Sequence, residues 1–266
     1  MDLLVGGRSV YAYTGGKPFD AGLPCVVFIH GALHDHSVWN LLARWFAHHG
    51  HAVLAIDQPG HGRTPGPPQP SVEALADGLL ALLDSAGVRQ AALVGHSMGA
   101  LIALEAAARA PERVTRLALL GAAFPMKVAP ALLALATDAP LRAIDQVNAW
   151  SHSGIAAKPA YPGPGNWLHG GNRALMRRNQ AADPGVNLFA HDFAVCDRYT
   201  GGLEAAERVR CPTRLVLGRD DQMAPPAGAR ALAAALGARV TELPCGHALM
   251  QEAPEATLQA LRDALA

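Results

Sequence analysis

The sequence has no excess of either charge and no long apolar run. Its 266 residues contain 22 Lys and Arg against 22 Asp and Glu, so it lacks the basic face that binds nucleic acid or an anionic membrane. No stretch approaches the roughly 20 consecutive apolar residues that span a bilayer. These absences argue against nucleic acid and membrane as partners. They are compatible with a small-molecule substrate and leave the oligomeric state open.

Cysteine is also scarce, and the four thiols lie far apart in the chain: Cys25, Cys196, Cys211 and Cys245. They form no C-x-x-C pair, and no histidine cluster has the spacing of zinc ligands. Residues so close together as His34-Asp35-His36 seldom share a coordination sphere, so we expect neither a metal nor a cofactor. The first residues, MDLLVGGR, lack the basic and apolar regions of a signal peptide. We therefore expect free thiols and a cytoplasmic protein.

Half of the residues are hydrophobic, and strand-like runs alternate with helix-like segments through most of the chain. Short apolar runs predict strands at 25–29, 52–56, 91–94, 115–120, 213–218 and 239–243. Helical periodicity predicts helices at 37–49, 71–86, 98–110 and 227–236, and a last helix from residue 254. This alternation is typical of an α/β fold in which helices flank a mostly parallel sheet.

The alternation fails between residues 124 and 202, where prolines and glycine pairs separate short helical pieces. A stretch of this length cannot be a plain loop in a compact domain, so it predicts a helical insertion. We therefore expect a core domain formed by residues 1–124 and 203–266, and a helical domain formed by residues 125–202.

The segment Gly95-His96-Ser97-Met98-Gly99 directly follows the strand predicted at 91–94 and precedes a helical run. A serine with glycines two residues away on each side is typical of a nucleophile elbow, a strained turn that exposes the serine oxygen at a helix N-terminus. Because glycine is common in this chain, the motif alone has little weight. The strand before it and the helix after it make Ser97 a candidate nucleophile.

A serine nucleophile needs a base, and the base needs a third group that orients it. A carboxylate, Asp220 or Asp221, follows the predicted strand 213–218, and His247 follows the last predicted strand. Catalytic groups of open parallel sheets gather at the carboxyl ends of strands, so these side chains are expected to converge with Ser97. The chain order Ser, Asp, His is also that of the α/β-hydrolases.

Four motifs in order give the chain a clear resemblance to capped, esterase-like serine hydrolases of the α/β-hydrolase fold. His30-Gly31-Ala32 resembles the family's HG loop, and residues 57–63 resemble its D-x-x-G-H-G loop. The elbow and the pair Gly218-x-x-Asp221 and Gly246-His247 complete the set. The family pattern places the acid at the fourth position of G-x-x-D, which selects Asp221 over Asp220.

The resemblance also implies further site residues. The backbone N–H groups of Ala32 and Met98 correspond to the family's oxyanion hole, and residues 125–202 correspond to its helical cap. The candidate substrate-binding residues are Trp39, Trp150 and Trp167. Other apolar residues of the segment are also candidates for an acyl pocket: Met126, Met176, Phe189, Phe193 and Tyr199. The pair Arg177-Arg178 is interpreted as solvated surface, and His30, His61 and His96 as structural residues.

The function expected from this resemblance is hydrolysis of a carboxylic ester, thioester or lactone with a small-to-medium apolar acyl group, through an acyl-enzyme. Two alternatives stay open. One is a carbon–carbon bond hydrolase of the same fold, although such enzymes carry a more glycine-rich HG loop than this chain. The other is a ligand receptor that retains the triad, which single rather than multiple turnover would reveal. The fold itself does not determine the substrate.

Overall fold

An eight-stranded sheet forms the centre of the protein in the computed structural model, which describes residues 1–266. Its strands are β1 (Asp2–Val5), β2 (Arg8–Tyr13), β3 (Cys25–Ile29), β4 (Ala52–Ile56), β5 (Ala91–His96), β6 (Val114–Leu120), β7 (Thr213–Gly218) and β8 (Arg239–Leu243). They are ordered β1-β2-β4-β3-β5-β6-β7-β8. The six strands β3 to β8 are parallel to one another, while β2 is antiparallel to both β1 and β4. The predicted α/β class with a mostly parallel sheet is confirmed.

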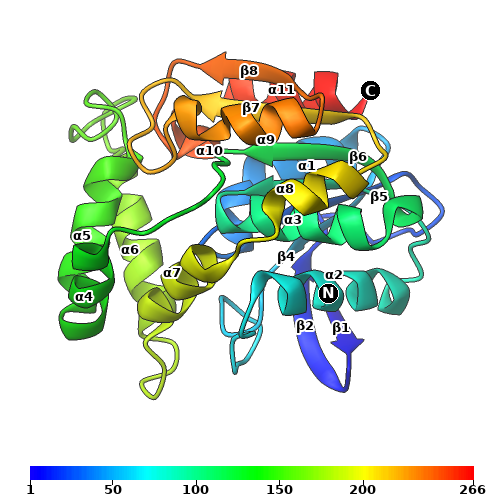
Figure 1. Ribbon diagram of the computed structural model, residues 1–266, viewed down its shortest axis with the longest axis horizontal. Helices are drawn as coiled ribbons and strands as arrows, with labels where there is room; N and C mark the ends of the chain where they lie inside the picture. The colour runs from blue at the N-terminus through cyan, green and yellow to red at the C-terminus, as the bar shows by residue number, and fades with distance from the viewer.

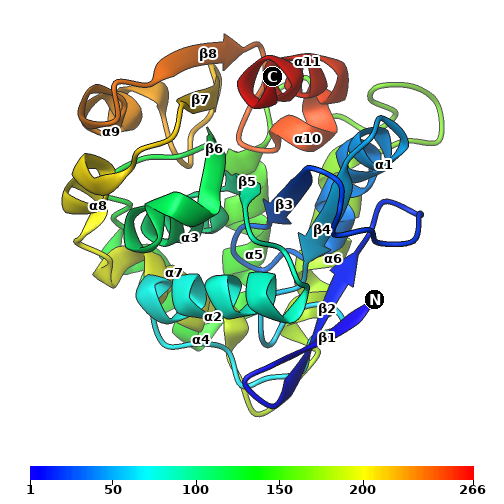
Figure 2. The ribbon, with the colours of Figure 1, turned by 90° about the vertical axis from the view of Figure 1, so that its right-hand side faces the viewer.

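Helices cover both faces of the sheet, as Figures 1 and 2 show. One layer contains α2 (Val72–Ser85), α3 (Met98–Arg109), α8 (Gly202–Arg208) and α9 (Arg230–Ala235), which follows the 3-10 turn η3 (Pro226–Ala229). The other contains α1 (Asn40–His48), α10 (Leu249–Glu252) and α11 (Pro254–Leu265). Two further 3-10 turns are η1 (His36–Trp39) and η2 (Pro111–Arg113).

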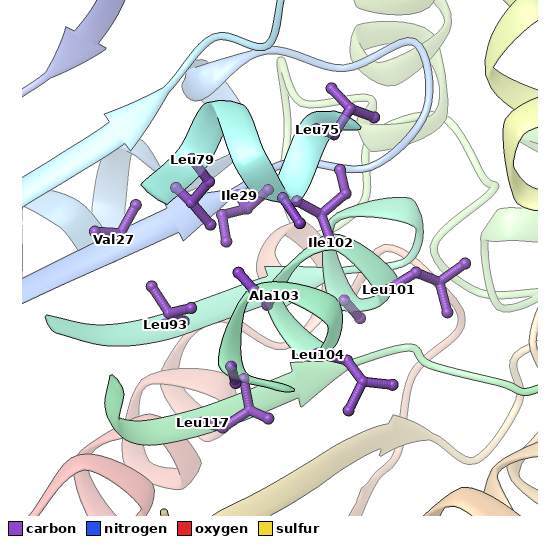
Figure 3. Close-up of a cluster of buried hydrophobic side chains, with 14 of the residues drawn as sticks. Val27, Ile29, Leu75, Leu79, Leu93, Leu101, Ile102, Ala103, Leu104 and Leu117 are labelled. Atoms are coloured by element: carbon purple, nitrogen blue, oxygen red, sulfur yellow. The ribbon is translucent and has the colours of Figure 1, made fainter. Parts of the chain in front are cut away.

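The two layers enclose separate apolar cores because side chains alternate between the faces of a strand. Val27 of β3 packs in the core beneath α2 and α3, whereas its neighbours Val26 and Phe28 pack in the core beneath α1 and α11. Figure 3 shows the first of these cores, with leucines of β5 and β6 against α3. Residues 98–108 of α3 are all buried, so this helix is enclosed on every side.

The helix predicted from residue 71 shows how local sequence sets the boundaries. The Ser71 side chain accepts a hydrogen bond from the Ala74 N–H at 3.2 Å, which satisfies a free donor of the first turn. The helix ends just before Gly87, which has a φ of +69°. Glycine enters this left-handed region without a steric penalty, so it ends the helix where the sequence predicts.

The N-terminal hairpin of β1 and β2 is an addition to the strands predicted from the sequence. The two strands are joined by Gly6 and Gly7, whose φ values are +53° and +81°. Two positive φ values favour Gly-Gly in a two-residue hairpin turn, so this pair was a usable signal. Leu3 of β1 and Val10 and Ala12 of β2 lie in the core beside α2.

Four helices follow β6 and precede α8: α4 (Pro130–Asp138), α5 (Pro140–Ser151), α6 (Leu168–Gln180) and α7 (Leu188–Arg198). They lie together at the end of the sheet where the parallel strands finish (Figure 1). All four fall within residues 125–202, and they share an apolar core around Ile144, Met176 and Phe189, which also contains Leu33. None of the helices in the protein combines the length and the apolar character that crossing a bilayer requires.

Candidate active site

Ser97 occupies a sharp turn between the end of β5 and the start of α3. Its φ of +54° and ψ of −118° lie outside the regions that serine normally adopts. An added Cβ at Gly95 would collide with the Gly99 carbonyl, and one at Gly99 would collide with the Ile29 carbonyl. The turn therefore requires both glycines, as expected of a nucleophile elbow.

His247 and Asp221 lie in the loops that follow β8 and β7, and they are hydrogen-bonded to each other. His247 Nδ1 donates to Asp221 Oδ2 at 2.7 Å. The other carboxylate oxygen, Oδ1, accepts from the backbone N–H groups of Met223 and Ala224, each at 2.8 Å. Asp220 is exposed, and only Asp221 is joined to the histidine.

The surroundings keep Asp221 ionised. Burial by itself raises the pKa of a carboxyl group, but the charge of His247, its hydrogen bond and the two backbone donors outweigh this effect. The pKa of Asp221 therefore lies below its ordinary value. An ionised Asp221 accepts from Nδ1–H, which leaves His247 Nε2 free to receive a proton.

Ser97 and His247 line the same cavity, which has a volume of about 200 Å³. Most of its wall is apolar and comes from the segment after β6, from α4, α5 and α7, and from the loop after β7: Met126, Val128, Leu132, Trp150, Phe193 and Met223. Lys127 and Gln222 add two polar side chains. The cavity thus joins a candidate nucleophile and base to a mainly apolar binding space.

Both predicted oxyanion residues lie near Ser97. Ala32 lines the cavity, and Met98 is the first residue of α3, directly after the serine. The HG loop runs close to the elbow, because an added Cβ on Gly31 would lie 3.1 Å from Ser97 Cβ. Backbone N–H groups of this loop and of the α3 N-terminus are therefore available near the serine.

Of the three tryptophans proposed for substrate binding, the structure brings only Trp150 to the cavity. Trp39 ends the turn η1 and is fully buried in the core beneath α1, with its ring centroid 5.2 Å from that of Phe28. Trp167 is 45% exposed, and its ring stacks on His169. The prediction that Trp39 and Trp167 bind substrate is therefore wrong. Trp39 packs on the sheet and Trp167 lies on the surface of the helical segment, so neither side chain reaches the cavity.

The other apolar candidates divide in the same way. Met126 and Phe193 line the cavity, whereas Met176 and Phe189 fill the core shared by α4–α7. Tyr199 lies neither in the cavity wall nor in the core shared by α4–α7. Its hydroxyl donates to the buried Glu105 carboxylate of α3 at 2.7 Å. Helical periodicity alone does not separate a side chain that lines a cavity from one that fills a core.

The histidines interpreted as structural do not line the cavity. His96 Nε2 donates to the His247 carbonyl oxygen at 2.9 Å, so it supports the loop that carries His247. Burial holds the pKa of His96 well below its ordinary value. His30 Nε2 accepts from the Gln58 N–H at 3.1 Å, and burial lowers the pKa of His30 to about 4.

One cluster of side chains has the composition of a metal site. One ligand atom from each of Asp35, His36 and Asp57 lies within 4.8 Å of the other two. Hydrogen-bond donors occupy the carboxylates: Asp57 accepts from the backbone N–H groups of His36 and Arg63 at 2.7 and 2.9 Å. Asp35 accepts from Arg178 Nη2 at 2.6 Å. The oxygens that a cation would need thus hold two loops and α6 together instead.

Both residues of the Arg177-Arg178 pair form ion pairs. Arg177 Nη2 donates to both oxygens of Asp145 in α5, at 2.9 and 3.0 Å. Arg178 reaches Asp35, a buried residue that follows the HG loop. The side chains of Arg177 and Arg178 are 37% and 65% exposed, which agrees with the interpretation of this pair as solvated surface. The structure adds that both guanidinium groups form ion pairs, one of which joins α6 to the core.

We expect acid to destabilise the fold through its buried histidines. Burial lowers the pKa values of His30, His34 and His96 in the folded protein, so the unfolded chain binds more protons below about pH 6.5. The free energy of unfolding should thus fall as the pH drops from about 7 to about 4.5, by roughly 2 kcal/mol for His30. The raised pKa of His61 acts in the opposite direction and partly offsets this loss. Urea unfolding at pH 7.5, 6.0 and 4.5 measures the net effect.

Two variants give this prediction a control. His96→Asn removes one buried histidine and should flatten the pH dependence, whereas His48→Gln removes an exposed one and should leave it unchanged. Equal stability of the parent protein at pH 7.5 and 4.5 would contradict the prediction.

The sequence and the architecture both identify the class of the protein. A family model described as "Alpha/beta hydrolase family" matches residues 26–260, so the chain belongs to the alpha/beta hydrolase family. Hydrolase activity is what this family and the relatives described below support.

One similar solved structure is that of the enol-lactonase from Burkholderia xenovorans LB400. It has a TM-score of 0.86 and 24% sequence identity, and the match covers 100% of this chain and 99% of that one. At this identity the likeness concerns the fold. The two chains thus share their fold over almost their whole length.

Two curated relatives extend the comparison. A "Putative carbamate hydrolase RutD" of Klebsiella pneumoniae (strain 342) is 29% identical over 234 residues, which is 85% of this chain and 84% of that protein. The "sn-1-specific diacylglycerol lipase ABHD11" of Mus musculus is 39% identical over 99 residues, which is 37% of this chain and 32% of that protein. The mouse match therefore spans only about a third of either protein.

Proposed function

We propose that this protein is a serine hydrolase that cleaves a carboxylic ester, thioester or lactone of a small-to-medium apolar acyl group. The observation that carries the proposal is one cavity lined by both Ser97 and His247, with His247 hydrogen-bonded to the buried Asp221 at 2.7 Å. Nucleophile, base and orienting carboxylate are the three parts that acyl transfer to serine requires.

The first half of the reaction forms an acyl-enzyme. His247 Nε2 takes the proton of Ser97 Oγ while Oγ bonds to the carbonyl carbon of the substrate. The carbonyl oxygen becomes an oxyanion, and the backbone N–H groups of Ala32 and Met98 donate hydrogen bonds to it. The carbon–oxygen or carbon–sulfur bond to the leaving group then breaks, and His247 returns the proton to that leaving group.

The second half releases the acid. A water molecule gives its proton to His247 Nε2 and attacks the acyl carbon, and the second tetrahedral intermediate expels Ser97 Oγ, which regains the proton. Asp221 stays ionised throughout, because its lowered pKa disfavours protonation. It stabilises the positive charge that His247 carries in each half of the reaction.

The cavity wall supports an apolar acyl group as the specificity element. Residues such as Met126, Leu132 and Trp150 offer no charge to a substrate, and burial of each CH₂ group contributes about 0.8 kcal/mol. With p-nitrophenyl esters, kcat/KM should therefore rise about fourfold per added carbon over the first few carbons. It should then fall once the volume of about 200 Å³ is filled.

The same ester series tests which residues form the cavity wall. Trp150→Ala enlarges the cavity and should move the best acyl length to longer chains. Trp167→Ala removes the same side chain from the surface of the same helical segment and should leave the profile unchanged. A flat profile in the parent, or an equal shift in both variants, would contradict an apolar acyl pocket at this position.

A fluorophosphonate probe, combined with lactones and thioesters as additional substrates, tests the reaction class. Stoichiometric labelling of Ser97, identified by peptide mass spectrometry, and many turnovers per protein molecule are the expected results. Labelling elsewhere would contradict the nucleophile assignment. A single turnover without product release would favour the receptor alternative.

A further inference from the structure

Leu33 has an unusual backbone for a leucine. It follows Ala32 in the HG loop and has a φ of +57°, in the left-handed region that favours glycine. A non-glycine residue in this region costs about 1 kcal/mol or more and persists only where its surroundings enforce it. The side chain is completely buried among the apolar residues of α4–α7, so the helical segment encloses it.

Both backbone polar groups of Leu33 are bound by side chains of the helical segment. Its N–H donates to Asp192 Oδ2 of α7 at 2.9 Å, and its carbonyl oxygen accepts from Asn179 Nδ2 of α6 at 3.1 Å. Each of these residues is only 2% exposed, so water cannot readily replace either bond. Leu33 is thus held at its N–H, its carbonyl and its side chain.

The two side chains that hold Leu33 are themselves held by a second core loop. His61 Nε2 lies 2.9 Å from the same Asp192 oxygen, and the Gly62 N–H donates to Asn179 Oδ1 at 2.9 Å. His61 and Gly62 belong to the D-x-x-G-H-G loop. Asp192 and Asn179 therefore join two core loops to two helices, and their orientation toward Leu33 is fixed from both sides.

We infer that Asp192 and Asn179 are positioning residues: Asp192 holds the Ala32–Leu33 peptide through the Leu33 N–H, and Asn179 holds the Leu33–His34 peptide through the Leu33 carbonyl. These two peptides set the path of the HG loop directly after Ala32, so that the Ala32 N–H, which belongs to the preceding Gly31–Ala32 peptide, is presented to the cavity as an oxyanion donor. The inference rests on the proposed function, because it assigns these residues to the oxyanion hole of that reaction. The helical segment would then have two roles: it forms most of the cavity wall, and through α6 and α7 it holds the loop that carries the oxyanion donor. The bonds from Asp192 and Asn179 to Leu33 are called the Leu33 clamp.

Asp192→Ala is the direct test. It leaves the Leu33 N–H without an acceptor, and we expect kcat for the best p-nitrophenyl ester to fall by about 10² to 10³, the effect of losing an oxyanion-hole donor. KM should change less than threefold, because Asp192 does not line the cavity. Inhibition by a boronic acid that mimics the tetrahedral intermediate should weaken in parallel with kcat.

Further variants separate positioning from stability. Asp192→Asn keeps an oxygen that can accept from Leu33 and should recover most of kcat, while Asn179→Ala releases the Leu33 carbonyl and should lower kcat without raising KM. Asn187→Ala is the matched control: it removes the N-cap of α7, whose side chain accepts from the Ala190 N–H at 3.1 Å, but no bond to Leu33. It should lower the melting temperature and leave kcat unchanged.

The outcomes are distinguishable. If the parent neither hydrolyses esters nor reacts with the fluorophosphonate at Ser97, the proposed function is wrong, and the role inferred for the Leu33 clamp is wrong as well. If the parent is active but Asp192→Ala and Asn179→Ala lower kcat no more than Asn187→Ala does, the clamp alone is wrong. If Asp192→Ala does not fold, Asn179→Ala decides between the same two results by comparison with Asn187→Ala.

Discussion

Replacing Ser97 by alanine is expected to lower kcat for ester hydrolysis by about 10⁶-fold, the size of the effect found when the serine of a subtilisin triad is removed. Alanine keeps the Cβ and the turn but lacks the oxygen that forms the acyl-enzyme. The fold should survive, because the serine side chain makes no hydrogen bond that supports the elbow. Steady-state kinetics with the best p-nitrophenyl ester measure the loss, and circular dichroism with a melting curve checks the fold.

The probe provides a control for Ser97→Ala. The variant should no longer react with the fluorophosphonate, while substrate binding in the cavity should persist with a similar dissociation constant. A well-folded variant with kcat within tenfold of the parent would show that another group is the nucleophile.

Asp221→Asn should produce the second large effect, a fall in kcat of about 10⁴-fold, by analogy with the same change in a serine protease triad. The carboxylate accepts from His247 Nδ1–H at 2.7 Å, whereas an amide can turn its NH₂ toward Nδ1. The imidazole would then carry its proton on Nε2, where it cannot take one from Ser97. Steady-state kinetics above pH 7 measure the effect.

Asp220→Asn is the matched control for Asp221→Asn, because it makes the same chemical change one residue earlier in the same loop. Asp220 is exposed, so kcat should stay within about twofold of the parent, as for most surface changes. If Asp220→Asn is the more damaging of the two substitutions, the acid has been assigned to the wrong residue.

Most of the sheet and the three candidate catalytic residues were predictable because their signals are local. The apolar runs at 25–29, 52–56, 213–218 and 239–243 coincide with β3, β4, β7 and β8. Ser97, Asp221 and His247 each follow a predicted strand, and the carboxyl ends of parallel strands meet at one edge of a sheet. A motif next to a strand end therefore places a side chain without knowledge of the packing.

Only the tertiary structure could separate the aromatic residues of the cavity from those of the cores. Trp39, Trp150 and Trp167 are chemically identical, yet Trp39 is buried beneath α1, Trp150 lines the cavity, and Trp167 is exposed and stacks on the half-buried His169. The side of a helix or turn that meets a cavity depends on how that element packs, and neighbouring sequence carries little information about this.

The Leu33 clamp was beyond prediction for the same reason. Leu33 meets Asn179 and Asp192, which lie 146 and 159 residues further along the chain, and no local pattern identifies these partners. The sequence alone determined the class of fold and which residues can carry the chemistry, because strand, turn and helix signals are short-range. The folded chain decided which side chains support that chemistry, because hydrogen bonds between distant loops exist only once the helices have packed against the sheet.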